Sequence, residues 1–202
     1  LDGRIEPHHQ FLLRLQLRRL RSLEQDITTL DSEIDIRLEP YATQHRLLMT
    51  IPGIDRVAAA VLIAEIGTDM TAFLSADHLA SWVGVCPGSN ESAGKRRSGK
   101  TRKGNAHLRA HLVQAATCAA RTRGTYYRNK YWRLKARRGA KRAQVALAHK
   151  ILVACYHMLR NATPFRDLGE TYLDALARKR TEKQLTRRLE ALGYRVTLVP
   201  AA

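Results

Sequence analysis

The chain has 202 residues, of which 45% are hydrophobic, so it is long enough and apolar enough to fold around its own core. Its 35 lysines and arginines against 18 acidic residues give a net charge of +17, which favours a polyanionic partner because each neutralised phosphate releases a counterion. The chain contains no long uncharged apolar run, which argues against a membrane-inserted protein.

The three cysteines, Cys86, Cys118 and Cys155, are odd in number and widely spaced, so they fit neither a zinc knuckle nor a disulfide framework. We expect thiols in or near the core of a protein in a reducing cytosol. Since the chain begins at Leu1 rather than at a methionine, we expect a fragment of a longer protein.

The first predicted element is a helix from about Phe11 to Leu38. Its apolar residues recur every seven positions, at Leu13, Leu20, Ile27 and Ile34. Leu23 and Leu30 supply a second seam position. So narrow a stripe favours a coiled coil or a dimerising hairpin over a helix packed on its own domain. Pro40 ends the element, and we assign residues 1–40 to a coiled-coil-like linker helix.

Residues 41–202 are predicted to form one compact helical domain, which starts with two helices and a tight turn over about residues 44–66. The segment LLMTIPGID resembles a helix-hairpin-helix, whose turn grips DNA phosphates through the backbone, and this assigns Pro52 and Gly53 to nucleic-acid binding. Asp55 stands where the pattern prefers a second glycine, and its charge would repel a phosphate. An ordinary helical corner is the alternative.

Beyond this corner we expect a long polar loop over residues 87–105, a basic helical region over residues 106–160, and a final segment, YRVTLV, that can form one short strand. Helices are expected at about Ala76–Val83, Ala106–Arg123, Tyr126–Arg138, Arg142–Arg160, Leu168–Lys179 and Glu182–Leu192. The fold class is therefore all-α: an N-terminal coiled-coil-like helix followed by a compact helical domain that contains a helix-hairpin-helix and a long basic loop.

The loop contains GKRRSGKT, residues 94–101, a formal match to the phosphate-binding P-loop. A P-loop lies between a buried strand and a helix whose amides converge on the phosphates. Here the preceding residues, CPGSNESA, are polar and turn-forming, and the RKGN that follows Thr101 would break a helix opening there. We therefore reject a nucleoside triphosphate site.

As a polynucleotide surface, the same loop offers six cations and an amide: Lys95, Arg96, Arg97, Lys100, Arg102, Lys103 and Asn105. A second group of candidate contacts follows in the basic helical region: Arg121, Arg128, Arg133, Arg137 and Arg138. Aromatic residues are interleaved with this second group, namely Tyr126, Tyr127, Tyr131 and Trp132. Cations for phosphates beside flat rings for bases are typical of nucleic-acid binding. A solvated charged face and core packing of the rings are the alternatives.

Ser92, in the segment NESAG, lies among glycines and cations, and its hydroxyl is a candidate nucleophile for a phosphodiester. Ser89 and Ser98 compete for that role, and loop serines mostly form turns. His107 and His111 are spaced as zinc ligands can be, but no third ligand accompanies them. We therefore predict no metal site in this chain and interpret both histidines as phosphate contacts or surface residues.

Four collinear segments look like one family: EPHHQFLL, IPGIDRVAAAVLIAEIGTDM, LASWVGVCPGSNESAGKRRSGKTRKGNAHLR and ALAHKILVACYHMLRNATPFRDLG. They resemble bacterial insertion-sequence transposases that have an N-terminal RuvC-like DEDD domain and a C-terminal half with a helix-hairpin-helix and a serine motif. The family includes the Piv-type DNA invertases and the recombinases guided by a bridge RNA.

This resemblance implies that Ser92, followed by Ala-Gly-Lys as in the family's serine motif, forms a covalent phosphoserine with DNA until a free 3′-hydroxyl reverses the step. It also implies DNA and a guide RNA as partners, a dimer or tetramer, and a cytoplasmic protein at the bacterial nucleoid. The family binds Mg²⁺ in the DEDD domain, which this chain lacks, so residues 1–202 are expected to hold no cofactor and to be inactive alone. A non-catalytic helix-hairpin-helix module and, more weakly, a nucleotide hydrolase are the rival interpretations.

Overall fold

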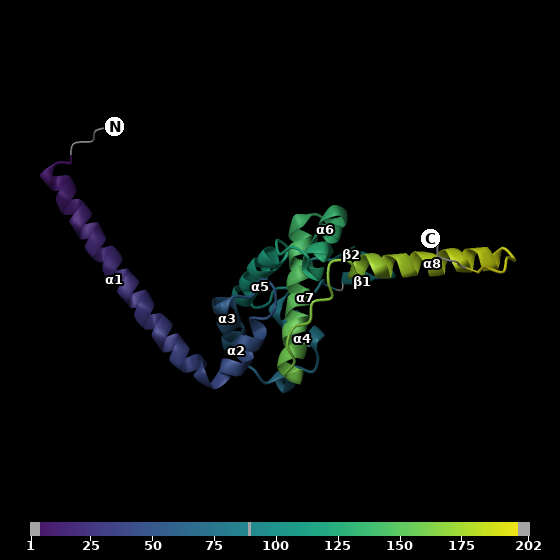
Figure 1. The fold of residues 1–202 in the computed structure, drawn as a ribbon, viewed down its shortest axis with the longest axis horizontal. Coiled ribbons are helices and arrows are strands. Elements are labelled where there is room, and N and C mark those ends of the chain that lie inside the picture. The colour runs from purple at the N-terminus through teal and green to yellow at the C-terminus, as the bar shows by residue number, and fades with distance from the viewer. Residues whose placement is uncertain (1–4, 89, 198–202) are drawn as a thin grey trace. The chain divides into compact units, whose positions relative to one another are not determined.

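The computed structural model describes residues 5–88 and 90–197 and confirms the all-α fold class, because the described chain is built almost entirely from helices (Figure 1). It divides into two compact units, Leu1–Ala42 and Thr43–Ala202. The division falls close to the boundary that the sequence predicts after residue 40.

The first unit contains the long helix α1, Pro7–Leu38, and the short 3₁₀ helix η1, Glu39–Tyr41. Proline at the first helical position and a reciprocal capping box between Glu6 and His9 start α1. None of the residues of α1 is buried. The side chains of the predicted seven-residue series are therefore in contact with solvent, between 44% and 58% exposed. Self-association through α1 stays a prediction.

In the second unit, two helices meet at the predicted corner: α2, Ala42–Leu48, and α3, Arg56–Ile66. The turn between them closes when the Ile54 amide donates to the Ile51 carbonyl oxygen (3.1 Å), and both isoleucine side chains are buried. Apolar burial thus anchors the turn in the core and fixes the corner.

Gly53 lets this turn approach the helix α5, Ala106–Ala119. Its φ of +89° lies in the left-handed region. A Cβ atom at this position would meet the Ala115 carbonyl oxygen at 2.3 Å and the Ala119 amide nitrogen at 2.7 Å. Glycine is therefore required both by the backbone conformation and by the contact with α5.

The core of the second unit is organised around α7, Ala140–Asn161 (Figure 1). The elements that pack against it are α5, α6 (Tyr126–Arg138), α4 (Ala76–Val83) and the 3₁₀ helix η2 (Met70–Ala72). Leu147, Ile151 and Leu152 are fully buried on α7, and the small Ala148 lets a neighbouring helix lie close. The predicted helix over Arg142–Arg160 is thus the centre of the domain.

The structure corrects the prediction of a long polar loop over residues 87–105. An antiparallel hairpin forms there, with β1 at Asn90–Ser92 and β2 at Lys95–Ser98. Its turn residues Ala93 and Gly94 have φ of +51° and +72°, as a two-residue turn that matches strand twist requires. The strands escape sequence analysis because they are polar and show no alternation of apolar residues.

The tail also differs from the prediction. The two helices expected there form one helix, α8, Tyr172–Ala191, because no glycine or proline interrupts the pattern between them. Residues 194–197 are not a strand, since the described chain places no strand beside them to complete a ladder. Residues 198–199 of the predicted strand lie outside the described residues.

We expect Gly53→Ala to lower the free energy of unfolding by about 3 kcal/mol or more, because the new methyl group would overlap backbone atoms of α5 as well as strain the turn. Gly124→Ala is the matched control, since Gly124 also has a positive φ (+73°) but no atom lies within 4 Å of a Cβ built there. The control should cost about 1–2 kcal/mol. Urea unfolding measures both losses, and equal values would contradict the contact with α5.

Candidate nucleic-acid site

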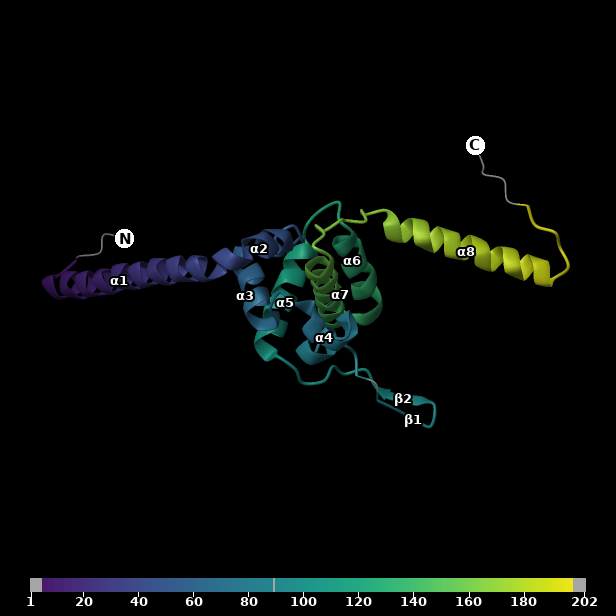
Figure 2. The same ribbon diagram turned by 90° about the horizontal axis from the view of Figure 1, so that it is seen from below.

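Ser92, the predicted nucleophile, is the last residue of β1 and is exposed. Its cross-strand partner is Lys95, on the other side of the two-residue turn. Figure 2 shows the hairpin extending away from the helices of the second unit. The Ser92 hydroxyl therefore lies near a tip that a long polymer can reach.

The cations of the loop divide into two groups. The predicted contacts on β2 have side chains that lie outside the described residues: Lys95, Arg96 and Arg97. The predicted contacts that follow β2 are exposed: Lys100, Arg102 and Lys103. Exposure makes this return segment accessible to phosphates, and the contact itself stays a prediction.

The formal P-loop match has the wrong local structure for a nucleotide site. Its residues 94–101 form the hairpin turn, β2 and the segment that follows, and the next helix, α5, starts only at Ala106. Helical amides therefore do not converge at Thr101 as they do on the phosphates of a P-loop. The geometry agrees with the rejection of a nucleotide hydrolase.

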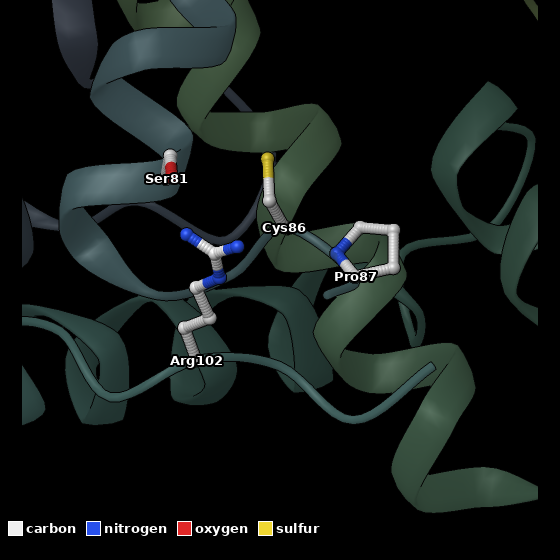
Figure 3. Close-up of a pocket in the computed structure, with 4 residues that line it drawn as sticks. All are labelled: Ser81, Cys86, Pro87 and Arg102. Atoms are coloured by element: carbon white, nitrogen blue, oxygen red, sulfur yellow. The ribbon is translucent and has the colours of Figure 1, made fainter. Parts of the chain in front are cut away.

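Arg102 lines a small pocket at the base of the hairpin, together with Ser81, Cys86 and Pro87 (Figure 3). Its volume of about 220 Å³ is below the range of about 300–1,000 Å³ usual for small-molecule sites. Burial raises the pKa of the Cys86 thiol, and the Asp77 carboxylate raises it further. Cys86 is therefore protonated at neutral pH and is not an activated nucleophile.

Backbone contacts hold the two ends of the hairpin segment together. The Gly88 amide donates to the Lys100 carbonyl oxygen (3.1 Å). Pro87 and Thr101 form one further antiparallel bridge. The base of the hairpin is therefore paired even though the strands themselves are short.

Asn105 joins this base to two helices. Its Oδ1 caps α5 by accepting from the Leu108 amide (2.9 Å), and its Nδ2 donates to the Glu65 carboxylate on α3 (2.6 Å). Its backbone amide donates to the Trp82 carbonyl oxygen (3.3 Å). Both polar ends of the Asn105 side chain are thus used inside the protein, and its predicted contact with nucleic acid stays a prediction.

At the predicted helix-hairpin-helix, Pro52 and Gly53 are half-buried. Asp55 is the N-cap of α3, where its carboxylate accepts from the Ala58 amide (2.8 Å). An acidic side chain therefore already accepts one of the free backbone amides in the first turn of α3, at the place where a phosphate would bind. This agrees with the expectation that Asp55 repels a phosphate, and a backbone grip on DNA at this corner stays a prediction.

An acidic segment that leads into α8 covers one side of the basic helix α6. Asp167 accepts from the Tyr126 amide at the start of α6 (3.0 Å), and Asp174 forms an ion pair with Arg133. Asn129 of α6 also donates to the Asp174 carboxylate (3.2 Å). Arg133, a predicted nucleic-acid contact, is therefore already held by an acid of the same chain.

The other predicted contacts of this region remain accessible. Arg128 is half-exposed, and three arginines are exposed: Arg121, Arg137 and Arg138. Arg121 lies beyond α5, which ends at Ala119 rather than at the predicted Arg123. The helix stops there because the Arg121 amide turns back to the Cys118 carbonyl oxygen (3.0 Å).

The packing of α6 on α7 brings Lys150 of α7 close to the cations of α6, which the sequence pattern does not indicate. Burial lowers the pKa of Lys130 on α6, and the charges of Lys150 on α7 and of Arg137 lower it further. Cations thus gather where the two helices meet, and a polyanion would relieve their repulsion. Helical periodicity predicts that Lys150 is exposed, but it cannot show which helix lies beside it.

Of the aromatic residues of α6, one packs in the core and another is exposed enough to stack on a base. Tyr127 is buried and stacks on Phe165, with ring centroids 5.4 Å apart, so it belongs to the core. Trp132 is 50% exposed, and the Lys135 ammonium lies 4.2 Å from its ring centroid. Trp132 is therefore the aromatic of this helix best placed to stack on a base.

The two histidines four residues apart do not complete a metal site. The rings of His107 and His111 meet in a T-shaped arrangement, with centroids 4.8 Å apart. Among residues 5–88 and 90–197, no group of three or more potential ligands could hold a metal ion.

The part of the chain that contains this site is similar to proteins of a known family. Residues 45–133, which run from α2 through the hairpin into α6, match the profile of the transposase family IS116/IS110/IS902. The uncharacterized 42 kDa protein of insertion element IS900 from Mycobacterium paratuberculosis is 32% identical, over 69% of this chain and 37% of that protein. The uncharacterized 43.6 kDa protein of insertion element IS110 from Streptomyces coelicolor is 32% identical, over 71% of this chain and 35% of that protein. The pilin gene-inverting protein of Moraxella bovis is 31% identical, over 72% and 47%.

Residues 45–133 therefore match a transposase domain of the IS110/IS116/IS902 family, and the similarity to insertion-element proteins and pilin gene-inverting proteins supports the resemblance at that level. The chain spans less than half the length of each of these relatives. Within the described residues, no helix combines the length and the apolar character that crossing a membrane requires.

We expect Asp174→Asn to raise the affinity for a nonspecific DNA duplex about three- to tenfold and to steepen its salt dependence by roughly one phosphate contact, because the change removes the carboxylate that neutralises Arg133. Glu182→Gln is the matched control: it removes one negative charge from the same helix, where Glu182 pairs with Arg178 (2.9 Å). Fluorescence anisotropy titrations at two salt concentrations measure both variants. Equal gains would show a general charge effect and contradict specific masking of Arg133.

Proposed function

We propose that this chain is the serine-bearing C-terminal module of a DNA transposase or site-specific recombinase. The observation that carries the proposal is the exposed Ser92 near the tip of a hairpin inside the family-matched region 45–133. A relative named for inverting a pilin gene supports a DNA rearrangement as the class of reaction.

In this proposal, the Ser92 Oγ attacks the phosphorus of a DNA phosphodiester. The Oγ–P bond forms as the P–O3′ bond breaks, and the departing 3′-oxygen takes up the proton that Ser92 loses. A 3′-hydroxyl of another strand later reverses the exchange. One P–O bond forms for each one broken, so the reaction needs no nucleotide hydrolysis. Lys95, the cross-strand partner of Ser92, and the adjacent Arg96 are proposed to stabilise the negative charge on the phosphorane.

The Mg²⁺ expected for a RuvC-like DEDD domain requires clustered carboxylates, which the described residues do not offer. The proposal therefore assigns those acids to the remainder of a full-length protein. Residues 1–202 by themselves are proposed to bind nucleic acid without completing strand exchange.

DNA and a guide RNA are both proposed partners, at different surfaces. The return segment with Arg102 and Lys103 lies on the chain next to the serine hairpin, which suits the DNA strand to be cut. The exposed end of α6, with Arg137, Arg138 and the half-exposed ring of Trp132, suits unpaired bases of an RNA, since stacking and phosphate contacts there need no base-pair geometry. The rival function is a non-catalytic nucleic-acid-binding module in which Ser92 is only a turn residue.

The helix α1 is proposed to pair with α1 of a second copy, giving a dimer or a tetramer. Its seven-residue series leaves apolar side chains exposed along one stripe, and the single chain buries none of them. A second identical stripe has the spacing to cover them.

In the full-length protein, we expect Ser92→Ala to abolish the covalent protein–DNA adduct while DNA binding survives, because the change removes the attacking oxygen and no cation. The measurement is a denaturing gel of a labelled duplex that spans one end of the insertion element encoding the protein. Ser98→Ala on β2 is the control and should leave the adduct intact. An adduct that persists in Ser92→Ala would contradict the proposal. DNA binding without any adduct in the unaltered protein would favour the non-catalytic nucleic-acid-binding module.

We expect the double change Leu20→Glu, Ile27→Glu to convert the protein to a monomer, since it places charges in the apolar stripe of α1. The control, Gln25→Glu with Ser32→Glu, adds the same charge to the opposite face of the helix and should leave the association state unchanged. Sedimentation equilibrium measures both. An unaltered protein that is already monomeric would contradict self-association through α1.

A further inference from the structure

Glu65 lies where an acidic residue is unfavourable without a specific partner. It is the second-last residue of α3, so its carboxylate faces the negative end of the helix dipole, and the residue is half-buried. The partner is Asn105, 40 residues further along the chain, whose Nδ2 donates to the carboxylate at 2.6 Å. A charge-assisted hydrogen bond of this length offsets part of the cost. The placement of Glu65 therefore serves the contact with Asn105 rather than the stability of α3.

Several backbone contacts lie between this hydrogen bond and the base of the hairpin. The Asn105 amide donates to the Trp82 carbonyl oxygen in α4. The preceding residue, Gly104, also packs against the Trp82 carbonyl oxygen, since a Cβ atom at Gly104 would lie 2.5 Å from it. The hydrogen bond from Gly88 to Lys100 then closes the base of the hairpin. The segment that returns from the hairpin is thus fixed to α4 at Asn105, while the segment that enters it leaves α4 directly, where the Val85 amide donates to the Ala80 carbonyl oxygen.

We propose that Glu65 is a positioning residue for the reaction of Ser92. Through Asn105, it fixes the base of the hairpin relative to α3, the helix that follows the predicted DNA-binding corner. The pair thereby couples a proposed DNA contact to the proposed nucleophile. The catalytic consequence rests on the proposed function, whereas the bracing of the hairpin can be measured without DNA.

Three variants isolate the hydrogen bond from its surroundings. Glu65→Gln keeps an oxygen acceptor for the Asn105 amide group. Asn105→Asp keeps an oxygen that caps α5 at Leu108, but it sets a carboxylate oxygen against Glu65 where a donor stood. The double variant, Glu65→Gln with Asn105→Asp, restores a donor and an acceptor with the hydrogen bond reversed. A rescue in the double variant therefore reports this contact and not the cap.

In the full-length protein, we expect Asn105→Asp to lower adduct formation at Ser92 at least about tenfold, because a displacement of a reacting group by about 1 Å can cost about a hundredfold in rate. Glu65→Gln and the double variant should stay within about threefold of the unaltered protein. Circular dichroism confirms that each variant is folded at the assay temperature. Adduct formation is compared at duplex concentrations that saturate each variant, because the added negative charge of Asn105→Asp lowers DNA affinity by itself. Saturation separates misplacement of Ser92 from loss of DNA binding.

Hydrogen exchange of the DNA-free protein supplies the second measurement. Peptides that contain the amides of Gly88 and Asn105 should exchange faster in Asn105→Asp and return to the original rate in the double variant. Unchanged exchange in Asn105→Asp, or a double variant that rescues neither exchange nor adduct, overturns the inference. If exchange follows the expected pattern but the adduct also forms in Ser92→Ala, the proposed function is overturned, and with it the catalytic role of Glu65, while the bracing stands.

Discussion

The backbone of α5 provides the contact surface on which both proposed nucleic-acid elements depend. Near the C-terminal end of α5, Gly53 brings the corner between α2 and α3 against Ala115 and Ala119. At its N-terminal end, Asn105 caps the helix and receives the hairpin as the chain returns to the domain. Because the approach of Gly53 is to backbone atoms of α5, it cannot relax as a contact between flexible side chains would. One helix therefore fixes the corner and the serine hairpin in a common frame.

A chain with a net charge of +17 has few acids, and several of them lie at structurally decisive points. Asp55 and Asp167 accept backbone amides at the starts of α3 and α6, where the helix dipole favours negative charge. Asp174 neutralises Arg133 on α6. The surplus of positive charge then lies at exposed positions such as Arg137 and Arg138, in the last turn of α6, where the dipole favours cations. The same placement that stabilises the helices thus leaves a basic surface that repels itself until a polyanion binds.

Local signals account for what could be predicted from the sequence. The helices α3 and α4 begin and end where apolar periodicity and capping residues indicate, because those signals act within one turn of the chain. The hairpin around Ser92 was missed, because its strands are defined by a turn that requires positive φ and not by an apolar face. The contact between Glu65 and Asn105, and the approach of Lys150 to Lys130, join residues that only the packed helices bring together. The sequence therefore indicates the candidate nucleophile but not the residues that are proposed to position it.

The weakness of the hairpin tip is compatible with a nucleophile that acts only on bound DNA. A two-stranded hairpin is marginally stable in water, and this one has three register pairs beyond its base. Its base is fixed by Gly88, by the bridge at Pro87 and by Asn105, whereas Ser92 lies at the end where pairing stops. A DNA strand that contacts the neighbouring cations would order this end and supply the phosphate at the same moment. In the proposed function, a fixed base with a tip ordered by substrate would limit attack to a bound phosphodiester, which is what a strand exchange without net hydrolysis requires.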